Sequence, residues 1–102
     1  MPELPELNPV IHGKLRLALL SLLAGVEAAE FTWLRARTGA TDGNLGAQLT
    51  RLEEAGYVAV QKRFVQRKPQ TIYRITETGR RALAEYVHAM KELLGLSAAS
   101  SK

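Results

Sequence analysis

The first apolar pattern of the chain has the spacing of a helix. Asn8 can cap a helix start, and Pro9 suits the first helical position because its missing N–H needs no partner there. Gly25 is a typical helix end. We therefore predict a buried helix over residues 9–24, preceded by an extended, proline-rich arm over residues 1–8. Its broad apolar face comprises Ile11, Leu15, Ala18, Leu19, Leu22 and Leu23.

Two shorter helices follow a brief extended piece at residues 29–31. Thr32 can cap the first, over residues 33–38, which ends near Gly39. Their connector, residues 38–40, has the length found in a helix-turn-helix.

The second of these helices is predicted over residues 42–55. Thr41 can cap it by accepting from the backbone N–H of Asn44, and Gly56 can end it. One narrow apolar stripe follows the helical period, formed by Leu45, Leu49 and Leu52.

The chain then changes to a strand pattern. Residues 57–61 and 71–75 are rich in β-branched and aromatic side chains, which favours two strands of an antiparallel hairpin. The loop between them, around residues 65–69, contains the highest density of positive charge.

A long amphipathic helix is predicted over residues 77–94, capped by Thr76 and closed by Gly95. Together with the first helix it carries more apolar surface than so small a core can cover, so we expect it to form a two-fold homodimer interface. The alternative is that it packs back on its own core. The expected interface residues are Leu83, Tyr86, Val87, Met90 and Leu94. Residues 96–102 are predicted to be a flexible tail, and residues 9–95 one domain.

The net charge of +4 is concentrated in one segment. Residues 57–76 contain no acid and five bases, whereas the rest of the chain has a net charge of −1. The five bases are Lys62, Arg63, Arg67, Lys68 and Arg74. A localised basic hairpin favours contact with a polyanion over a merely solvated face.

Composition argues against several classes of protein. There is no cysteine, and His12 and His88 stand far apart without ligand-spaced carboxylates, so no metal site or cofactor is predicted. No phosphate-binding glycine loop or nucleophile motif is present, and we do not expect an enzyme. The apolar run at residues 17–24 is too short to span a bilayer, which favours a cytoplasmic protein without a membrane partner.

The predicted order of elements is helix, short strand, helix, helix, strand, wing, strand, helix. It is mainly α with a small β-hairpin (α+β), and it resembles the winged-helix DNA-binding domain of MarR/ArsR-like bacterial and archaeal regulators. The resemblance covers residues 8–94 and rests on two ordered runs, Thr41-Asp42-Gly43-Asn44-Leu45-x-x-x-Leu49-x-x-Leu52-Glu53-x-x-Gly56-Tyr57-Val58 and Pro69-x-Thr71-x-Tyr73-x-Ile75-Thr76-x-x-Gly79-Arg80. The opening Asn8-Pro9-Val10-Ile11-His12-Gly13-x-x-Arg16-Leu17 is similar to a short subgroup of these regulators.

The resemblance implies a homodimer on double-stranded DNA, with helix 42–55 in the major groove and the wing 62–70 on a flanking backbone or minor groove. Asn44 and Gln48 are expected to pair with adenine edges, Gly43 to allow close approach, and Arg51 to reach guanine or phosphate. The expected contacts on the recognition helix are Thr41, Asp42, Gly43, Asn44, Ala47, Gln48 and Arg51, and those on the wing are Lys62, Arg63, Gln66, Arg67, Lys68 and Arg74. Arg35 and Arg37 are expected to add contacts to the DNA backbone.

Three positions, two on the recognition helix and one on the wing, depart from the usual pattern of these regulators. Gly46 and Gln48 stand where Ser and His are usual, and Gln66 stands where the wing tip often has glycine. The homodimer that the resemblance implies predicts a near-palindromic operator, but because of these departures the operator sequence is not predicted. No effector is predicted either. The competing prediction is a winged helix that acts as a protein–protein interaction module in a larger complex.

Overall fold

The computed structural model describes residues 4–96. Its elements are α1 (Lys14–Ala24), β1 (Ala29–Glu30), α2 (Phe31–Thr38), α3 (Asp42–Glu54), β2 (Val58–Val65), β3 (Lys68–Ile75) and α4 (Glu77–Leu93). The strands form one antiparallel sheet in the order β1-β3-β2. The predicted fold class and element order are confirmed. Residues 1–3 of the predicted arm and 97–102 of the predicted tail lie outside the described residues.

The first helix begins five residues later than its sequence pattern predicts. Asn8 does accept hydrogen bonds, from the backbone N–H groups of Val10 at 2.9 Å and Ile11 at 3.4 Å, but it stabilises only a single turn. Gly13 then takes an extended backbone conformation, with φ −160° and ψ 137°, and this separates the turn from α1. Ile11 is nevertheless fully buried, so the predicted core residue is correct although the predicted helix boundary is wrong.

The helix-turn-helix pair agrees more closely with its sequence. Helix α2 begins at Phe31, two residues before the predicted start, so Thr32 lies inside the helix rather than capping it. In α3, Thr41 accepts from the N–H of Asn44 at 3.2 Å, as predicted. Gly56 follows α3 with a φ of 82°, a left-handed conformation that glycine adopts without strain.

The hairpin is longer and tighter than its sequence predicts. Strands β2 and β3 remain paired from Val58↔Ile75 out to Val65↔Lys68, and only Gln66 and Arg67 form the turn. Pro69, predicted in the loop, pairs with Phe64. The short strand β1 pairs only with Ile72 and Tyr73, so it does not reach Pro69, and the missing N–H costs no hydrogen bond with β1.

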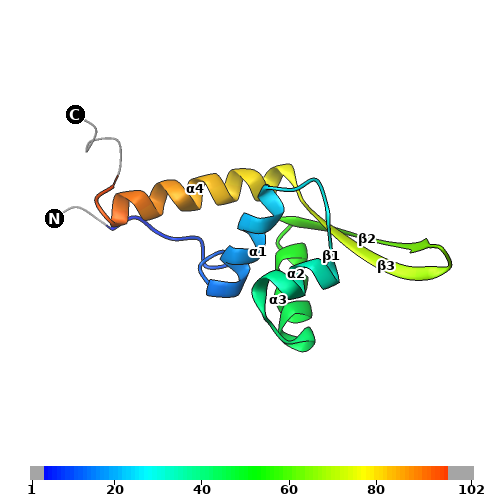
Figure 1. Cartoon of the computed structure of the whole chain (residues 1–102). Coiled ribbons are helices and arrows are strands. Elements are labelled where there is room, and N and C mark those ends of the chain that lie inside the picture. Colours follow the sequence, from blue (N-terminus) through cyan, green and yellow to red (C-terminus); the bar gives the residue numbers. More distant parts are fainter. Residues whose placement is uncertain (1–3, 97–102) are drawn as a thin grey trace.

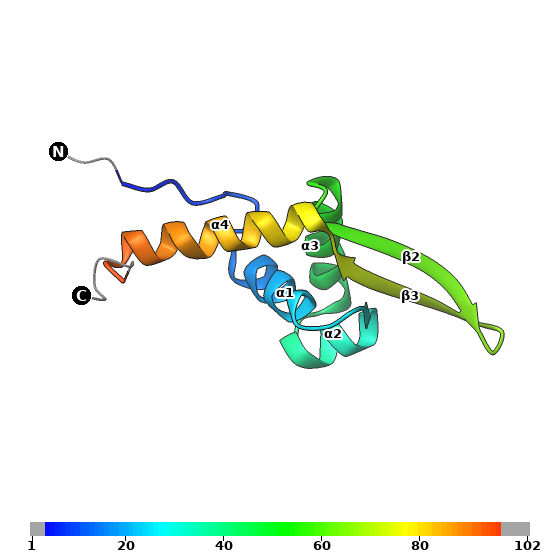
Figure 2. The same ribbon diagram turned by 90° about the horizontal axis from the view of Figure 1, so that it is seen from above.

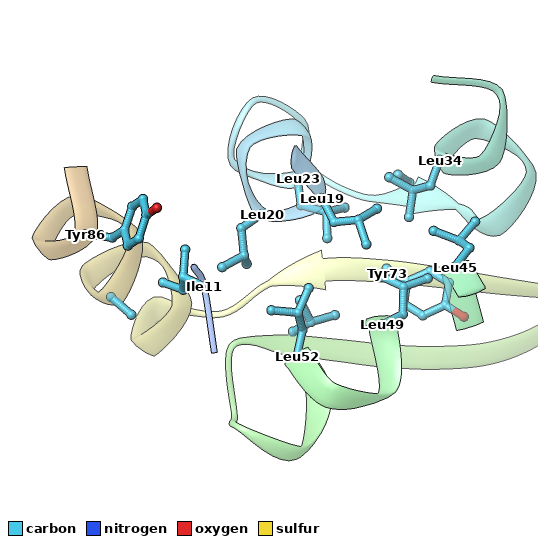
Figure 3. Packing of buried hydrophobic residues seen from close by; sticks show 13 residues of the cluster. Ile11, Leu19, Leu20, Leu23, Leu34, Leu45, Leu49, Leu52, Tyr73 and Tyr86 are labelled. Atoms are coloured by element: carbon cyan, nitrogen blue, oxygen red, sulfur yellow. The ribbon is translucent and has the colours of Figure 1, made fainter. Parts of the chain in front are cut away.

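One apolar core joins the three-helix unit to the sheet and to the first half of α4 (Figure 3). Its largest fully buried side chains are Ile11, Leu19, Leu20, Leu23, Leu34, Leu45, Leu49 and Leu52. The stripe predicted for α3 therefore faces the core, and the opposite face of α3 is left to solvent.

Helix α4 and the hairpin extend from opposite ends of the molecule (Figures 1 and 2). The buried residues of α4 are Gly79, Ala82 and Tyr86, and Met90 packs partly against the core beyond them. A side chain at Gly79 would overlap the backbone carbonyl of Tyr57, so this close approach requires glycine. Within residues 4–96, no helix is long and apolar enough to cross a membrane.

Candidate nucleic-acid interface

The solvent face of α3 has the composition expected of a surface that reads DNA. Thr41, Asp42, Gly43, Asn44, Ala47 and Arg51 are exposed, and Gln48 is half-buried at its edge. Apart from the adjoining backbone of α3 itself, no heavy atom lies within 4 Å of the position of a Cβ on Gly43, so this surface is open to close approach. The structure thus brings all seven residues predicted on this helix to one accessible region.

Three polar side chains link α1 to this face. Arg16 Nη1 donates to Gln48 Oε1 at 2.6 Å, and Gln48 Nε2 donates to Asn44 Oδ1 at 3.1 Å. The other guanidinium nitrogens are held by the turn before α1, since Nε donates to the carbonyl of Val10 and Nη2 to that of Pro9 at 3.4 Å. From the sequence, the amides of Asn44 and Gln48 were predicted to belong to this surface, but Arg16 was assigned no role there. The reason is that Gln48, the partner of Arg16, lies 32 positions away in the sequence.

Asp42 lies beside a cation rather than open to an approaching phosphate. Arg35 Nη1 lies 2.7 Å from Asp42 Oδ1, and both side chains are substantially exposed. Asp42 is the first residue of α3, where a carboxylate also interacts favourably with the helix dipole, whereas Thr41 is the capping residue. Arg37, the other basic residue of α2, lies 4.4 Å from the centre of the Trp33 ring. Both arginines of α2 therefore already contact side chains of their own chain.

The hairpin, residues 58–75, forms an exposed basic wing. Lys62, Arg63, Arg67, Lys68 and Arg74 are all exposed, and among the described residues none of them forms an ion pair with a carboxylate. Arg63 Nε donates to Gln70 Oε1 at 2.6 Å, a cross-strand contact that orients its guanidinium. The five positive charges are thus available to an outside anion.

The turn at the tip of this wing is strained. Gln66 and Arg67 have φ values of 52° and 68°, and a two-residue turn with positive φ at both positions is a type I′ turn. Such turns favour Asn-Gly because other residues pay a steric cost in the left-handed region. Gln66 and Arg67 therefore hold an unfavourable backbone conformation at the most exposed end of the molecule.

The phenol of Tyr73 has a raised pKa. Its burial raises the pKa above the ordinary value of 10.0, and the nearby carboxylate of Glu53 raises it further. The phenol therefore stays neutral over the physiological range and acts as a packing residue between the sheet and α3 (Figure 3).

The side chains predicted for a dimer interface divide between two environments. Tyr86 is only 4% exposed and its hydroxyl lies 2.8 Å from His12 Nδ1, so it contributes chiefly to the core of its own chain. Leu83 and Met90 are half-buried, whereas Val87 and Leu94 are exposed. Leu93 and Leu96, which the sequence pattern did not single out, are also exposed at the same end of α4.

Comparison with known proteins agrees with this geometry. Residues 15–94 match the family described as winged helix DNA-binding domain. Uncharacterized protein MJ0432 of Methanocaldococcus jannaschii is 36% identical over 84 residues, which cover 82% of this chain and 91% of that protein.

Solved structures of regulators have the same fold. A transcriptional regulator homologue from Pyrococcus horikoshii superposes with a TM-score of 0.79 at 24% identity, covering 84% of this chain and 85% of the other. A MarR-family regulator from Enterococcus faecalis gives 0.67 at 26% identity, with coverages of 84% and 76%. The transcriptional repressor BigR from Xylella fastidiosa gives 0.62 at 28% identity, with coverages of 76% and 74%. The chain belongs to the winged helix DNA-binding domain family, and its fold is similar to that of a MarR-family transcriptional regulator.

Proposed function

We propose that the protein is a homodimeric transcriptional repressor that binds a near-palindromic double-stranded DNA operator. Helix α3 enters the major groove, and the wing, residues 62–70, lies on the flanking backbone or minor groove. The observation that carries this proposal is the pairing of an exposed polar α3 face with an acid-free hairpin of five exposed bases.

The two surfaces have different tasks in this proposal. Helix α3 offers amides and Arg51 to base edges but carries no net positive charge, since its single base, Arg51, stands against Asp42, Glu53 and Glu54. The wing carries the charge that attracts phosphates without regard to sequence. Affinity therefore depends mainly on the wing, and sequence discrimination on α3.

The homodimer is supported by exposed apolar side chains towards the C-terminal end of α4. Val87, Leu93 and the capping residue Leu94 continue the face of α4 that packs on the core through Ala82 and Tyr86. Contiguous exposed apolar surface is typical of an interaction site. In a two-fold dimer that binds DNA by the usual helix-turn-helix geometry, the two recognition helices lie one DNA turn, about 34 Å, apart, which implies a near-palindromic site. A dimer bound across such an operator represses by excluding other proteins from it.

The proposal is tested by selecting bound duplexes from a random pool, followed by titration of the selected and random duplexes at increasing salt. We expect a two-fold symmetric consensus and a steep loss of affinity with salt. Replacing Lys68 by alanine removes one phosphate contact from each protomer and is expected to reduce the salt slope by about two units for both duplexes. Lys91→Ala is the matched control, because it removes the same charge from an exposed position on α4 and leaves the wing intact. Absence of binding to any duplex at low salt would refute the proposal.

The competing role as a protein–protein module uses the same apolar end of α4. Sedimentation separates the two: the proposal requires a self-associating chain at tens of micromolar, whereas a module built for another protein remains a monomer until that partner is added.

A further inference from the structure

We infer that Arg16, which lies on α1 outside the recognition helix, is a positioning residue that sets which base Asn44 reads. The inference rests on the proposed DNA-binding function and concerns the hydrogen-bond polarity of the chain Arg16–Gln48–Asn44.

The direction of this chain follows from the chemistry of arginine. A guanidinium has only donors, so the atom of Gln48 that faces Arg16 Nη1 at 2.6 Å must be its carbonyl oxygen. The amide nitrogen of Gln48 then faces Asn44, and only the carbonyl oxygen of Asn44 can accept from it, at 3.1 Å. One fixed donor on α1 thereby orients two amides that would otherwise be free to flip.

The orientation leaves Asn44 with a donating edge. Oδ1 and Nδ2 branch from one planar carbon, so turning Oδ1 towards Gln48 turns Nδ2 away from it, and Asn44 is exposed at this point. The usual bidentate contact of asparagine with adenine requires the amide oxygen to accept from adenine N6 while the nitrogen donates to N7. Gln48 occupies one lone pair of Oδ1 and turns the carbonyl towards itself, so Asn44 presents its N–H groups to the groove, and guanine offers two adjacent acceptors, N7 and O6. We therefore expect guanine, rather than the adenine predicted from residue type alone, at the base pair under Asn44.

Gly13 provides the space that Arg16 needs. A Cβ at position 13 would lie 2.8 Å from Arg16 Nη2 and 3.0 Å from Cζ, both too close for normal contact. The backbone φ of Gly13 is −160°, which any residue can adopt, so alanine is tolerated by the backbone but displaces the guanidinium. Gly13→Ala therefore disturbs the chain of hydrogen bonds without removing a charge.

The test compares base preferences, position by position, for duplexes selected by the wild type and five variants. Asn44→Ala identifies the base pair that Asn44 contacts, because preference is lost there alone. At that pair the wild type is expected to favour guanine over adenine by about fivefold or more, the lower range for a specific base contact. Arg16→Met, Gly13→Ala and Gln48→Met each release the amide of Asn44 and are expected to shift the preference towards adenine by a similar factor. Gln48→Met leaves the backbone contacts of Arg16 in place, so it remains informative if Arg16→Met lowers folding stability. Lys14→Met is the control, since it removes one charge from α1 without touching the three residues.

Each outcome decides between the inference and its alternatives. The three variants that release the amide of Asn44, here called the relay variants, are Arg16→Met, Gly13→Ala and Gln48→Met. A guanine preference that moves towards adenine in these variants, but not in Lys14→Met, supports the role of Arg16. The inference is overturned by an adenine preference in the wild type, by an unchanged preference in the relay variants, by an equal shift in Lys14→Met, or by an Asn44→Ala variant that alters no single base pair. Failure of the wild type to select any duplex refutes the proposed function itself and is thus distinguishable from failure of this inference.

Discussion

Replacing Arg67 by glycine at the tip of the wing is expected to change folding stability and DNA binding in opposite directions. Arg67 has a φ of 68° and is exposed, so the side chain gains little packing in return for a left-handed backbone. Glycine removes both the steric cost and the positive charge.

The two effects have separate magnitudes. A non-glycine residue in the left-handed region costs roughly 1–2 kcal/mol, and because the outer wing is exposed and opens locally, we expect the free energy of unfolding to rise by only about 1 kcal/mol. For a domain of this size, that corresponds to an increase of about 4–8 °C in the melting temperature. Loss of one phosphate contact per protomer is expected to lower the slope of log K against log salt by about 0.9 for each wing, or about 1.8 for the dimer.

Thermal melting followed by circular dichroism gives the melting temperature. Fluorescence anisotropy with a random duplex over a range of salt gives the slope of log K against log salt. Gln66→Asn is the matched control: asparagine tolerates the φ of 52° better than glutamine and the charge is unchanged, so stability rises while the salt slope stays the same. A fall in melting temperature on Arg67→Gly would contradict the type I′ turn. An unchanged salt slope would show that Arg67 does not contact DNA phosphate.

Four further changes test other parts of the structure. Gly46→Ala is expected to raise the free energy of unfolding by up to about 1 kcal/mol in urea titration, because the helix interior gains alanine and nothing lies within 4 Å of the new Cβ. Gly79→Ala should lower it by about 1–3 kcal/mol in the same assay, because the new Cβ overlaps the carbonyl of Tyr57; equal stability would contradict the close approach of α4. Burial raises the pKa of Tyr73, so the unfolded chain ionises first above pH 10.0 and stability falls there, and Tyr73→Phe should flatten this alkaline decline in melting temperature. Val87→Glu is expected to produce a monomer by sedimentation with weakened operator binding and an unchanged fold by circular dichroism, and a dimer of wild-type affinity would rule out this face of α4 as the interface.

Local chemistry accounts for the parts of the fold that are predictable from sequence. Thr41 and Thr76 cap their helices by accepting from N–H groups three positions ahead, at 3.2 Å and 2.9 Å, and such contacts depend only on neighbouring residues. The same reasoning failed at Asn8, which accepts from the N–H of Ile11, three positions ahead, at 3.4 Å but begins only a single turn, because the extended conformation of Gly13 interrupts the helix.

Features that depend on distant residues were not predictable. The apolar period of α4 is the same whether a residue faces its own core or a second chain, so Tyr86 was assigned to an interface although it is 4% exposed. The hairpin length was underestimated because Gln66-Arg67 lacks the Asn-Gly signature of a type I′ turn. The amides of Asn44 and Gln48 were identified from residue type, but their orientation depends on Arg16, a contact that only the folded chain creates.

The turn that precedes α1 means that the smallest stable unit of this protein is longer than its family match. The match starts at residue 15, yet Ile11 is fully buried, and Asn8 Nδ2 donates to the hydroxyl of Tyr57 at 2.8 Å. A truncated chain starting at residue 15 would open a hole in the core and leave the guanidinium of Arg16 without its carbonyl partners. Transplanting only the matched segment, or α3 alone, onto another regulator would therefore transfer the recognition helix without the residues before α1 that fix its side chains in position.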